Sequence, residues 1–180
     1  MAYILERTLK GIKHMHKLSV IHRDIKGENI MVMPNGEIKI CDFGFATPHV
    51  NTVINKELCG TPGYMDEYVP LFGWALTSDC KSVGSLAMEF LFGGKLSFPV
   101  MTKSCDDMTD KEAWELNKEI IYLSLVKLDT LYQTHNQLRH FVSTCMSPNA
   151  TAKELLGHEF LSIRLRNKKE FRMWCGEALA

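Results

Sequence analysis

The residues best suited to chemistry lie in one stretch of eight, His22-Arg23-Asp24-Ile25-Lys26-Gly27-Glu28-Asn29. Transfer of a phosphoryl group to a hydroxyl needs an acceptor for the hydroxyl proton, a cation near the transferring phosphate and ligands for Mg²⁺. Asp24, Lys26 and Asn29 are residues of these three types within six positions. Asp42, thirteen positions after Asn29, adds a second oxygen ligand of the kind that Mg²⁺ prefers. The pattern therefore indicates metal-assisted phosphoryl transfer.

Two short strand-like runs connect Asn29 to Asp42. They are Ile30–Met33 and Glu37–Cys41, and Pro34-Asn35-Gly36 separates them. Asn-Gly between short apolar runs predicts a β-hairpin, because both residues tolerate a positive φ. Such a hairpin is short enough to fold back and bring Asp42 beside Asn29.

The rest of the chain is expected to be mainly helical, as judged from the spacing of its apolar residues. Residues 45–70 have poor periodicity and many Gly, Pro, Thr and Asn residues, which is typical of a long functional loop. Ser78–Phe92 has little polar face, which predicts a buried central helix. Other helices are predicted at 2–17, 111–128, 131–145 and 150–160, with a surface helix in the Arg- and Lys-rich tail from Leu161. The expected fold is a mainly α helical bundle with one small β-hairpin.

Length and composition indicate one globular domain and argue against several classes of protein. The chain has 180 residues, and its 21 Lys and Arg residues balance 21 Asp and Glu residues. A formal net charge of zero argues against binding nucleic acid or an anionic membrane, because such proteins usually carry a basic excess. The six cysteines are scattered, with no CxxC pair and no zinc-site spacing, so free thiols are expected. No apolar run approaches the ~18–20 residues that cross a bilayer, and we expect a cytoplasmic or nuclear protein.

The order of these motifs resembles that of the eukaryotic serine/threonine protein kinases, in which HRD and DFG elements flank such a hairpin. The resemblance implies that Asp24 is the catalytic base and that Lys26 lies near the γ-phosphate of ATP. It also implies that Asn29 and Asp42 bind Mg²⁺ and that Met31 packs beneath adenine. A Lys two residues after the Asp matches the serine/threonine pattern rather than the tyrosine pattern. ATP and Mg²⁺ are therefore the expected cofactors, and a protein is the expected substrate.

Two further matches lie beyond the hairpin. Gly60-Thr61-Pro62-Gly63-Tyr64 resembles the segment that receives the substrate residue in kinases, which implies that Thr61 hydrogen-bonds near Asp24 and Lys26. Asp79 resembles an aspartate at the start of a buried helix in that family. The resemblance implies that its carboxylate accepts hydrogen bonds from the backbone of the catalytic loop.

The resemblance continues to Leu155-Leu156-Gly157-His158-Glu159-Phe160, which is similar to a sequence that closes kinase domains. We therefore expect the C-terminal lobe of a kinase domain at residues 1–161 and a basic, helical tail at 162–180. Before the first predicted helix the sequence has no glycine-rich loop, no strand Lys, no acidic residue to orient that Lys and no adenine-binding hinge. The small lobe, which provides most of the ATP-binding surface in relatives, is thus expected to be missing.

Three departures from the family lie inside the C-terminal lobe. Met65-Asp66-Glu67 stands where relatives carry APE, and the resemblance makes Glu67 the counterpart of that Glu. An Arg pairs with it in relatives, but Pro148-Asn149-Ala150-Thr151 here lacks the Arg. A buried carboxylate without its partner costs ~3–5 kcal/mol, unless another partner or exposure to solvent relieves it. Lys81 also occupies a position that is usually Trp.

Arg23 is the residue in the motif that suggests regulation. In relatives the Arg before the base often binds a phosphate on the activation loop through bidentate hydrogen bonds. Thr47 and Thr52 are candidate phosphate acceptors here. Glu57 lies near the position where many relatives carry the phosphorylated Thr, so it is either a constitutive negative charge or an ordinary solvated Glu.

Three interpretations of function remain open. The first is part of an active kinase that transfers phosphate from ATP to protein Ser or Thr hydroxyls, which accounts for the intact catalytic polar residues. The second is a non-catalytic, pseudokinase-like binding or scaffold protein, which accounts for the departures. The third is an enzyme completed by a separate small-lobe polypeptide. We adopt the kinase interpretation, and we predict little phosphotransfer by the isolated 180 residues and an exposed apolar surface where a small lobe would dock.

Overall fold

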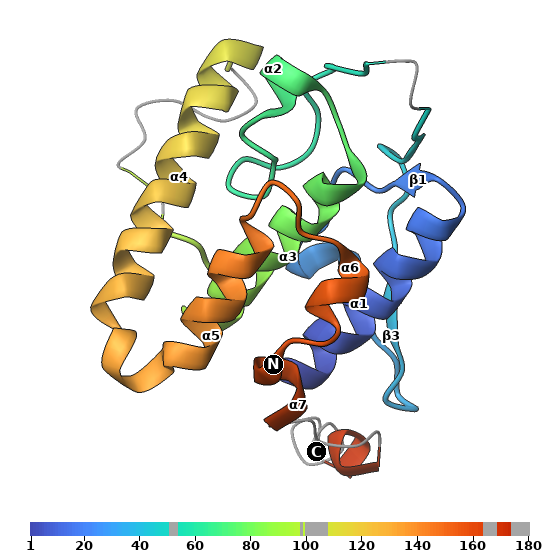
Figure 1. The fold of residues 1–180 in the computed structure, drawn as a ribbon, viewed down its shortest axis with the longest axis vertical. Coiled ribbons are helices and arrows are strands. Elements are labelled where there is room, and N and C mark those ends of the chain that lie inside the picture. The colour runs from blue at the N-terminus through green and yellow to red at the C-terminus, as the bar shows by residue number, and fades with distance from the viewer. Residues whose placement is uncertain (51–53, 98, 100–107, 164–168, 174–180) are drawn as a thin grey trace.

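The computed structural model describes residues 1–50, 54–97, 99, 108–163 and 169–173. Helices dominate it, which confirms the mainly α prediction (Figure 1). In chain order the helices and strands are α1 (Ala2–Lys17), β1 (Val20–Ile21), β2 (Ile30–Val32), β3 (Ile38–Ile40), β4 (Thr47–Pro48), α2 (Val69–Phe72), α3 (Leu76–Leu91), α4 (Asp110–Thr130), α5 (Tyr132–Cys145), α6 (Ala152–Leu155) and α7 (Glu159–Ile163). A single 3₁₀ turn at Gly27–Asn29 precedes β2. The strands form two antiparallel pairs, β1 with β4 and β2 with β3.

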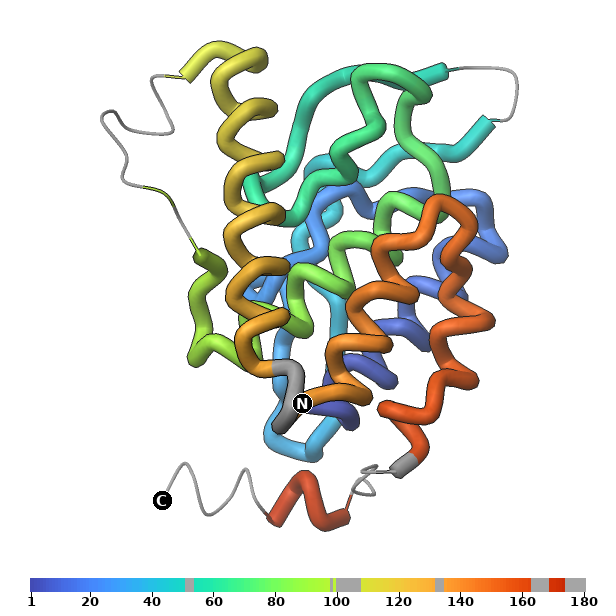
Figure 2. The backbone as a smooth tube through the Cα atoms, turned by 60° about the vertical axis from the view of Figure 1, so that its left-hand side comes forward, coloured from blue at the N-terminus to red at the C-terminus, as the bar shows by residue number. Residues whose placement is uncertain are grey.

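The central helix is α3, and it is buried along most of its length, as predicted. Every residue from Ser78 to Glu89 is buried. α1 and α5 both pack against α3, and α1 contributes Leu5, Leu9 and Ile12, which have no exposed surface. α4 and α5 run antiparallel along one side of the molecule (Figure 2). Because α3 lies at the centre, its side chains can reach loops on several sides.

The predicted hairpin forms from β2 and β3, with Met31 paired with Lys39. Its turn uses one residue with positive φ rather than two. Gly36 has a φ of +74°, whereas the Asn35 side chain accepts a hydrogen bond from Glu37 N at 3.0 Å. Met33 N donates a hydrogen bond to Glu37 O at 2.8 Å, which extends the pairing and leaves a three-residue connection that the positive φ of Gly36 closes.

A second pair of strands was not predicted, because it involves the long loop at 45–70. β1 and β4 pair with Val20 opposite Pro48 and Ile21 opposite Thr47. Each strand has two residues, too few to show any alternation in sequence. The pairing holds the beginning of the long loop beside the residues that precede the HRD motif.

The helix predicted at 150–160 is instead two short helices, α6 and α7, which are separated by Leu156–His158. Thr151 caps α6, since its hydroxyl accepts a hydrogen bond from Glu154 N and the Glu154 carboxylate accepts one from Thr151 N. Gly157 lies in the interruption, and glycine is a poor helix former. The prediction of one continuous helix was therefore wrong.

The basic tail is described in part. Residues 169–173 are helical, and the Phe171 ring stacks on Tyr3 of α1 with centroids 4.6 Å apart. The predicted helix at 164–168 and 174–180 lies outside the described residues. Within the ranges described, no helix has both the length and the apolarity needed to span a membrane.

Candidate functional site

Asp79, in the first turn of α3, holds the backbone of the loop that carries the HRD motif. Its carboxylate is fully buried and accepts hydrogen bonds from His22 N and Arg23 N, each at 3.0 Å. His16 of α1 lies 2.9 Å from the same carboxylate through Nε2. Arg23 has a left-handed φ of +70°, which costs roughly 1–2 kcal/mol in a residue with a Cβ. The Asp79 bonds stabilise this conformation and confirm the contact that the sequence implied.

Asp24 lies at the centre of the polar constellation, and its side chain is almost completely buried. Thr61 Oγ1 donates a hydrogen bond to Asp24 Oδ1 at 2.7 Å, and Lys26 Nζ donates to Thr61 Oγ1 at 2.7 Å. Lys26 Nζ also lies 3.1 Å from Asp24 Oδ2. Asn29 Nδ2 donates to Asp24 Oδ2 at 3.0 Å and to Asp24 O at 2.9 Å. The fold therefore brings together these four side chains, which come from two segments more than 30 positions apart.

Thr61 reaches this loop because Gly60 allows the two backbones to approach. Gly60 has a φ of +98°, and a Cβ added there would lie 2.5 Å from Arg23 O. A larger residue would have to displace the backbone and with it the Thr61 hydroxyl. The glycine in the GTPGY segment is thus a requirement of close packing.

Met31 lies on β2, two residues after Asn29, and Asp42 lies two residues after the end of β3. Cys41 N donates to Asn29 O at 3.0 Å, so the residue that follows Cys41 returns to the neighbourhood of Asn29, as predicted. Asp42 is exposed, with a φ of +59°, and Met31 is 49% exposed on β2. An amide oxygen and a carboxylate are hard oxygen donors, which fits Mg²⁺.

Metal binding by Asn29 and Asp42 would need further ligands that do not come from the described residues. The described residues contain no group of three or more His, Cys, Asp or Glu side chains that could hold a metal ion. Mg²⁺ is commonly held by one or two protein ligands together with phosphate oxygens. The donor set of Asn29 and Asp42 therefore suits a metal that arrives with a phosphate ligand.

The Arg23 side chain points to the long loop, where it meets a carboxylate. Arg23 Nη1 donates to Glu57 Oε2 at 2.9 Å, and Arg23 Nε donates to Phe45 O at 2.5 Å. Trp74 Nε1 donates to Glu57 O at 2.7 Å, and the guanidinium carbon lies 5.8 Å from the Trp74 ring centroid. Of the two interpretations of Glu57, this geometry favours the one in which its charge faces Arg23. Thr47 lies in β4, and Thr52 lies outside the described residues.

Glu89 is a residue of the site that the sequence reasoning missed. It is buried near the end of α3, and its Oε2 accepts a hydrogen bond from Gly27 N at 3.2 Å. The Tyr64 hydroxyl hydrogen-bonds the same carboxylate. Burial, and to a lesser degree the charge of Glu28, raise the pKa of Glu89 above its ordinary value. A lone charged residue in the second half of α3, after Ser82, was the signal that could have identified it.

Asn117 of α4 is the second missed residue, and it has no exposed surface. Its Oδ1 accepts from Gly63 N at 2.7 Å, and its Nδ2 donates to Met65 O at 3.2 Å. It thus holds the backbone that follows Thr61. The available signal was a polar residue one turn from Ile120 and Ile121, on the helix face that these apolar residues mark as buried.

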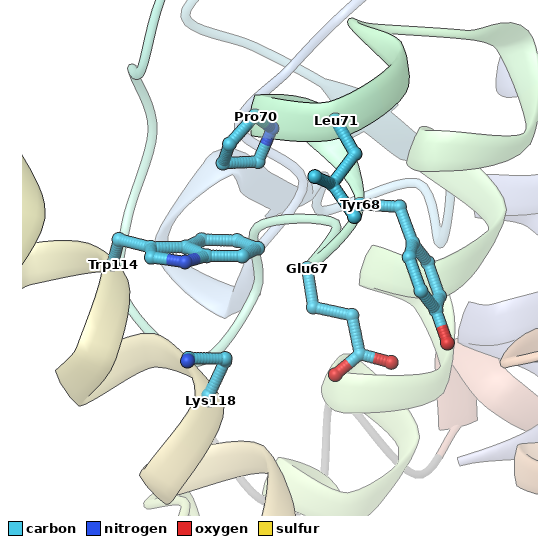
Figure 3. Close-up of a pocket in the computed structure, with 6 residues that line it drawn as sticks. All are labelled: Glu67, Tyr68, Pro70, Leu71, Trp114 and Lys118. Atoms are coloured by element: carbon cyan, nitrogen blue, oxygen red, sulfur yellow. The ribbon is translucent and has the colours of Figure 1, made fainter.

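Glu67 does not lie at this constellation. It is half-buried and lines an open surface pocket, where it faces Trp114 and Lys118 of α4 (Figure 3). The buried carboxylate of this segment belongs to the preceding residue, Asp66, which lies 2.6 Å from Lys81 Nζ. The expected unpaired buried Glu is therefore absent, because Glu67 has access to solvent and Asp66 has a cation.

Comparison with known proteins finds a family model and relatives that are all protein kinases. A family model of the protein kinase domain matches residues 1–161. The chain is 33% identical over 169 residues to the serine/threonine-protein kinase pakA of Talaromyces marneffei, a match that covers 84% of this chain and 26% of the relative. It is 29% identical over 178 residues to the serine/threonine-protein kinase dst1 of Dictyostelium discoideum, covering 91% and 21%. It is 30% identical over 161 residues to the serine/threonine-protein kinase PAK 5 of Rattus norvegicus, covering 86% and 21%. The chain thus spans about a fifth to a quarter of the length of these relatives.

Proposed function

The chain belongs to the eukaryotic serine/threonine protein kinase family, and on that premise we propose that it carries the catalytic residues for ATP-dependent transfer of phosphate to protein Ser or Thr hydroxyls. The observation that supports this most is the hydrogen-bonded set of Asp24, Lys26, Asn29 and Thr61.

In this proposal each side chain has one task. Asp24 accepts the proton of the substrate hydroxyl, since Asn29 Nδ2 and Lys26 Nζ orient its Oδ2. Lys26 places a positive charge near the transferred phosphoryl group. Asn29 and Asp42 would hold Mg²⁺, which supplies charge neutralisation on the phosphates of ATP. The Thr61 hydroxyl, between Lys26 and Asp24, sets the side of the loop from which an acceptor residue approaches.

ATP would receive few contacts from these 180 residues alone. Met31 is the apolar residue that would pack beneath adenine, and it is half exposed. Val32, Phe43 and Phe45 are also 44–50% exposed, on β2 and in the loop after β3. This apolar surface supports a protein partner or a further lobe above the site. We therefore propose that the isolated residues transfer phosphate slowly, because positioning provides most of the catalysis in this reaction.

The same surface is the observation that favours a second candidate function, a non-catalytic binding or scaffold protein. Measuring the native polypeptide by blot and mass spectrometry separates the two. A product clearly larger than 20.5 kDa, with peptides upstream of Met1, supports the kinase. A native product of that mass makes the binding function the leading one.

Nucleotide binding tests the site itself. The ¹⁵N-labelled chain is titrated with ATP, with and without Mg²⁺, and backbone amide shifts are followed by NMR. We expect changes at Asn29, Met31 and Asp42, with a Mg²⁺-dependent part that is lost in Asp42→Asn and kept in the exposed control Asp129→Asn. Shifts elsewhere only would contradict the proposed site, and robust phosphorylation that depends on Asp24 would contradict the proposed low activity.

A further inference from the structure

Lys81 is a buried cation on the central helix α3, and a buried charge needs a partner. Its side chain is 7% exposed, and its Nζ lies 2.6 Å from Asp66 Oδ1. Asp66 Oδ2 accepts from Ser78 Oγ at 2.8 Å, and Asp66 Oδ1 accepts from Tyr68 N at 3.0 Å. The ammonium also lies 4.1 Å from the Tyr68 ring centroid. Both charged groups therefore have partners, which is the condition under which a buried ion pair is tolerated.

This pair is part of a row of contacts between α3 and the segment after Thr61. Ser78, Lys81 and Ser82 are spaced i, i+3 and i+4, so they lie on one face of α3. Ser82 Oγ donates to Tyr64 O at 2.7 Å, next to the Asp66 contacts. The face thus holds residues 64–66, and the buried ion pair is its charged contact.

We propose that Lys81 is a positioning residue for Thr61, because its ion pair with Asp66 anchors the end of the segment 61–66 on α3. The same helix holds the catalytic loop through Asp79. One rigid helix therefore fixes both partners of the contact between Thr61 and Asp24, and Lys81 is the cation on that helix that holds the segment through Asp66. This role rests on the proposed function, since phosphoryl transfer is what gives the Thr61 hydroxyl its task.

Lys81 also explains a departure noted in the sequence. The Arg that pairs with the APE Glu in relatives is absent, and a Lys replaces the usual Trp. The carboxylate and the cation that form the pair are only 15 positions apart in this chain. The ion pair therefore connects the segment 61–66 directly to α3.

The test separates anchoring of the segment from a general contribution to stability. It compares a variant that removes only the Lys81 charge with a variant that removes the charges of both Lys81 and Asp66. Lys81→Met leaves the buried Asp66 carboxylate without its cation, whereas Asp66→Asn/Lys81→Met removes both charges. Lys81→Arg keeps a cation, and Lys39→Met removes one from an exposed surface pair as a control. Global stability is read from urea unfolding. Local order is read from hydrogen exchange at Gly63 N and Tyr64 N and from the NOE between the Thr61 methyl group and Lys26.

In Lys81→Met we expect exchange at both amides to rise on the order of 100-fold, because breaking a buried pair leaves an uncompensated charge. The double variant is expected to recover global stability but to keep exchange about tenfold faster and a weakened Thr61–Lys26 NOE. Lys81→Arg and Lys39→Met should show native protection. Native protection and a native NOE in the double variant would overturn the proposal, even if Lys81→Met fails to fold. Neither readout uses nucleotide or phosphotransfer, so failure here is distinct from failure of the proposed function.

Discussion

The clearest consequence of the fold is that Asp79→Asn should strongly destabilise the chain. Asp79 accepts two backbone hydrogen bonds, from His22 N and Arg23 N, and a contact from His16 at zero exposure. Asn is nearly the same size, so the change alters the hydrogen bonding and the charge rather than the packing. One of its two oxygen positions becomes an NH₂ donor that faces another donor.

The magnitude follows from these contacts. A buried donor that loses its acceptor costs about 1–3 kcal/mol, and a hydrogen bond to a charged acceptor contributes about 1.5–3 kcal/mol, part of which is lost when the acceptor becomes neutral. Together they give about 2–5 kcal/mol, against a total stability of about 5–15 kcal/mol for a domain. The left-handed Arg23 also loses part of what stabilises it.

Urea unfolding followed by circular dichroism measures this loss. With a slope of about 1–3 kcal/mol per M, a loss of about 2–5 kcal/mol should lower the urea midpoint by at least about 0.7 M. Asp129→Asn is the matched control, because Asp129 is largely exposed and its ion pair with Arg139 is on the surface; its effect should stay below about 1 kcal/mol. A midpoint for Asp79→Asn equal to that of the control would refute the view that Asp79 carries the catalytic loop.

Three other predictions concern different parts of the molecule. Glu57→Gln removes the charge that faces Arg23, so hydrogen exchange at residues 54–60 should rise. The free energy of unfolding measured in urea should change by less than about 1 kcal/mol, because the carboxylate is 65% exposed; unchanged exchange would favour an ordinary solvated Glu. Burial, and then His140, lower the pKa of His158 below its ordinary 6.5, so the unfolded state binds the proton first and stability declines as pH falls below about 6.5. The stability advantage of wild type over His158→Asn should shrink over that range, and a constant difference would contradict it. Burial raises the pKa of Cys80 to about 12, so mass spectrometry should find it unalkylated by iodoacetamide at pH 8 until urea unfolds the chain; rapid native labelling would disprove its burial.

The parts of the fold that sequence predicted correctly depend on near neighbours. The apolar spacing of 2–17 and the shortage of polar residues in 78–92 predicted α1 and α3, because helix burial has a period that is visible within one segment. The hairpin was predicted from Asn35-Gly36 between two short apolar runs, and of these two residues Gly36 takes the positive φ. The prediction was wrong at 150–160, where a capped turn and a glycine outweighed apolar content.

The candidate site divides in the same way. Asp24, Lys26 and Asn29 could be identified from sequence because one short loop carries them, and chemistry alone restricts which residue types serve. Pairings between distant segments were decided by packing. Nothing local distinguishes Asp66 from Glu67, and the structure buries the first because Lys81 of α3 faces it, 15 positions away.

Asn117 and Glu89 also form hydrogen bonds with distant segments of the chain, and sequence reasoning missed both. The sequence by itself determined the motifs, their order and the helices that follow from apolar spacing. Tertiary structure alone decided which polar groups meet inside, such as Gly63 N with Asn117 over 54 positions. The physical reason is that a buried polar group must find a partner wherever packing provides one, and sequence spacing does not record that choice.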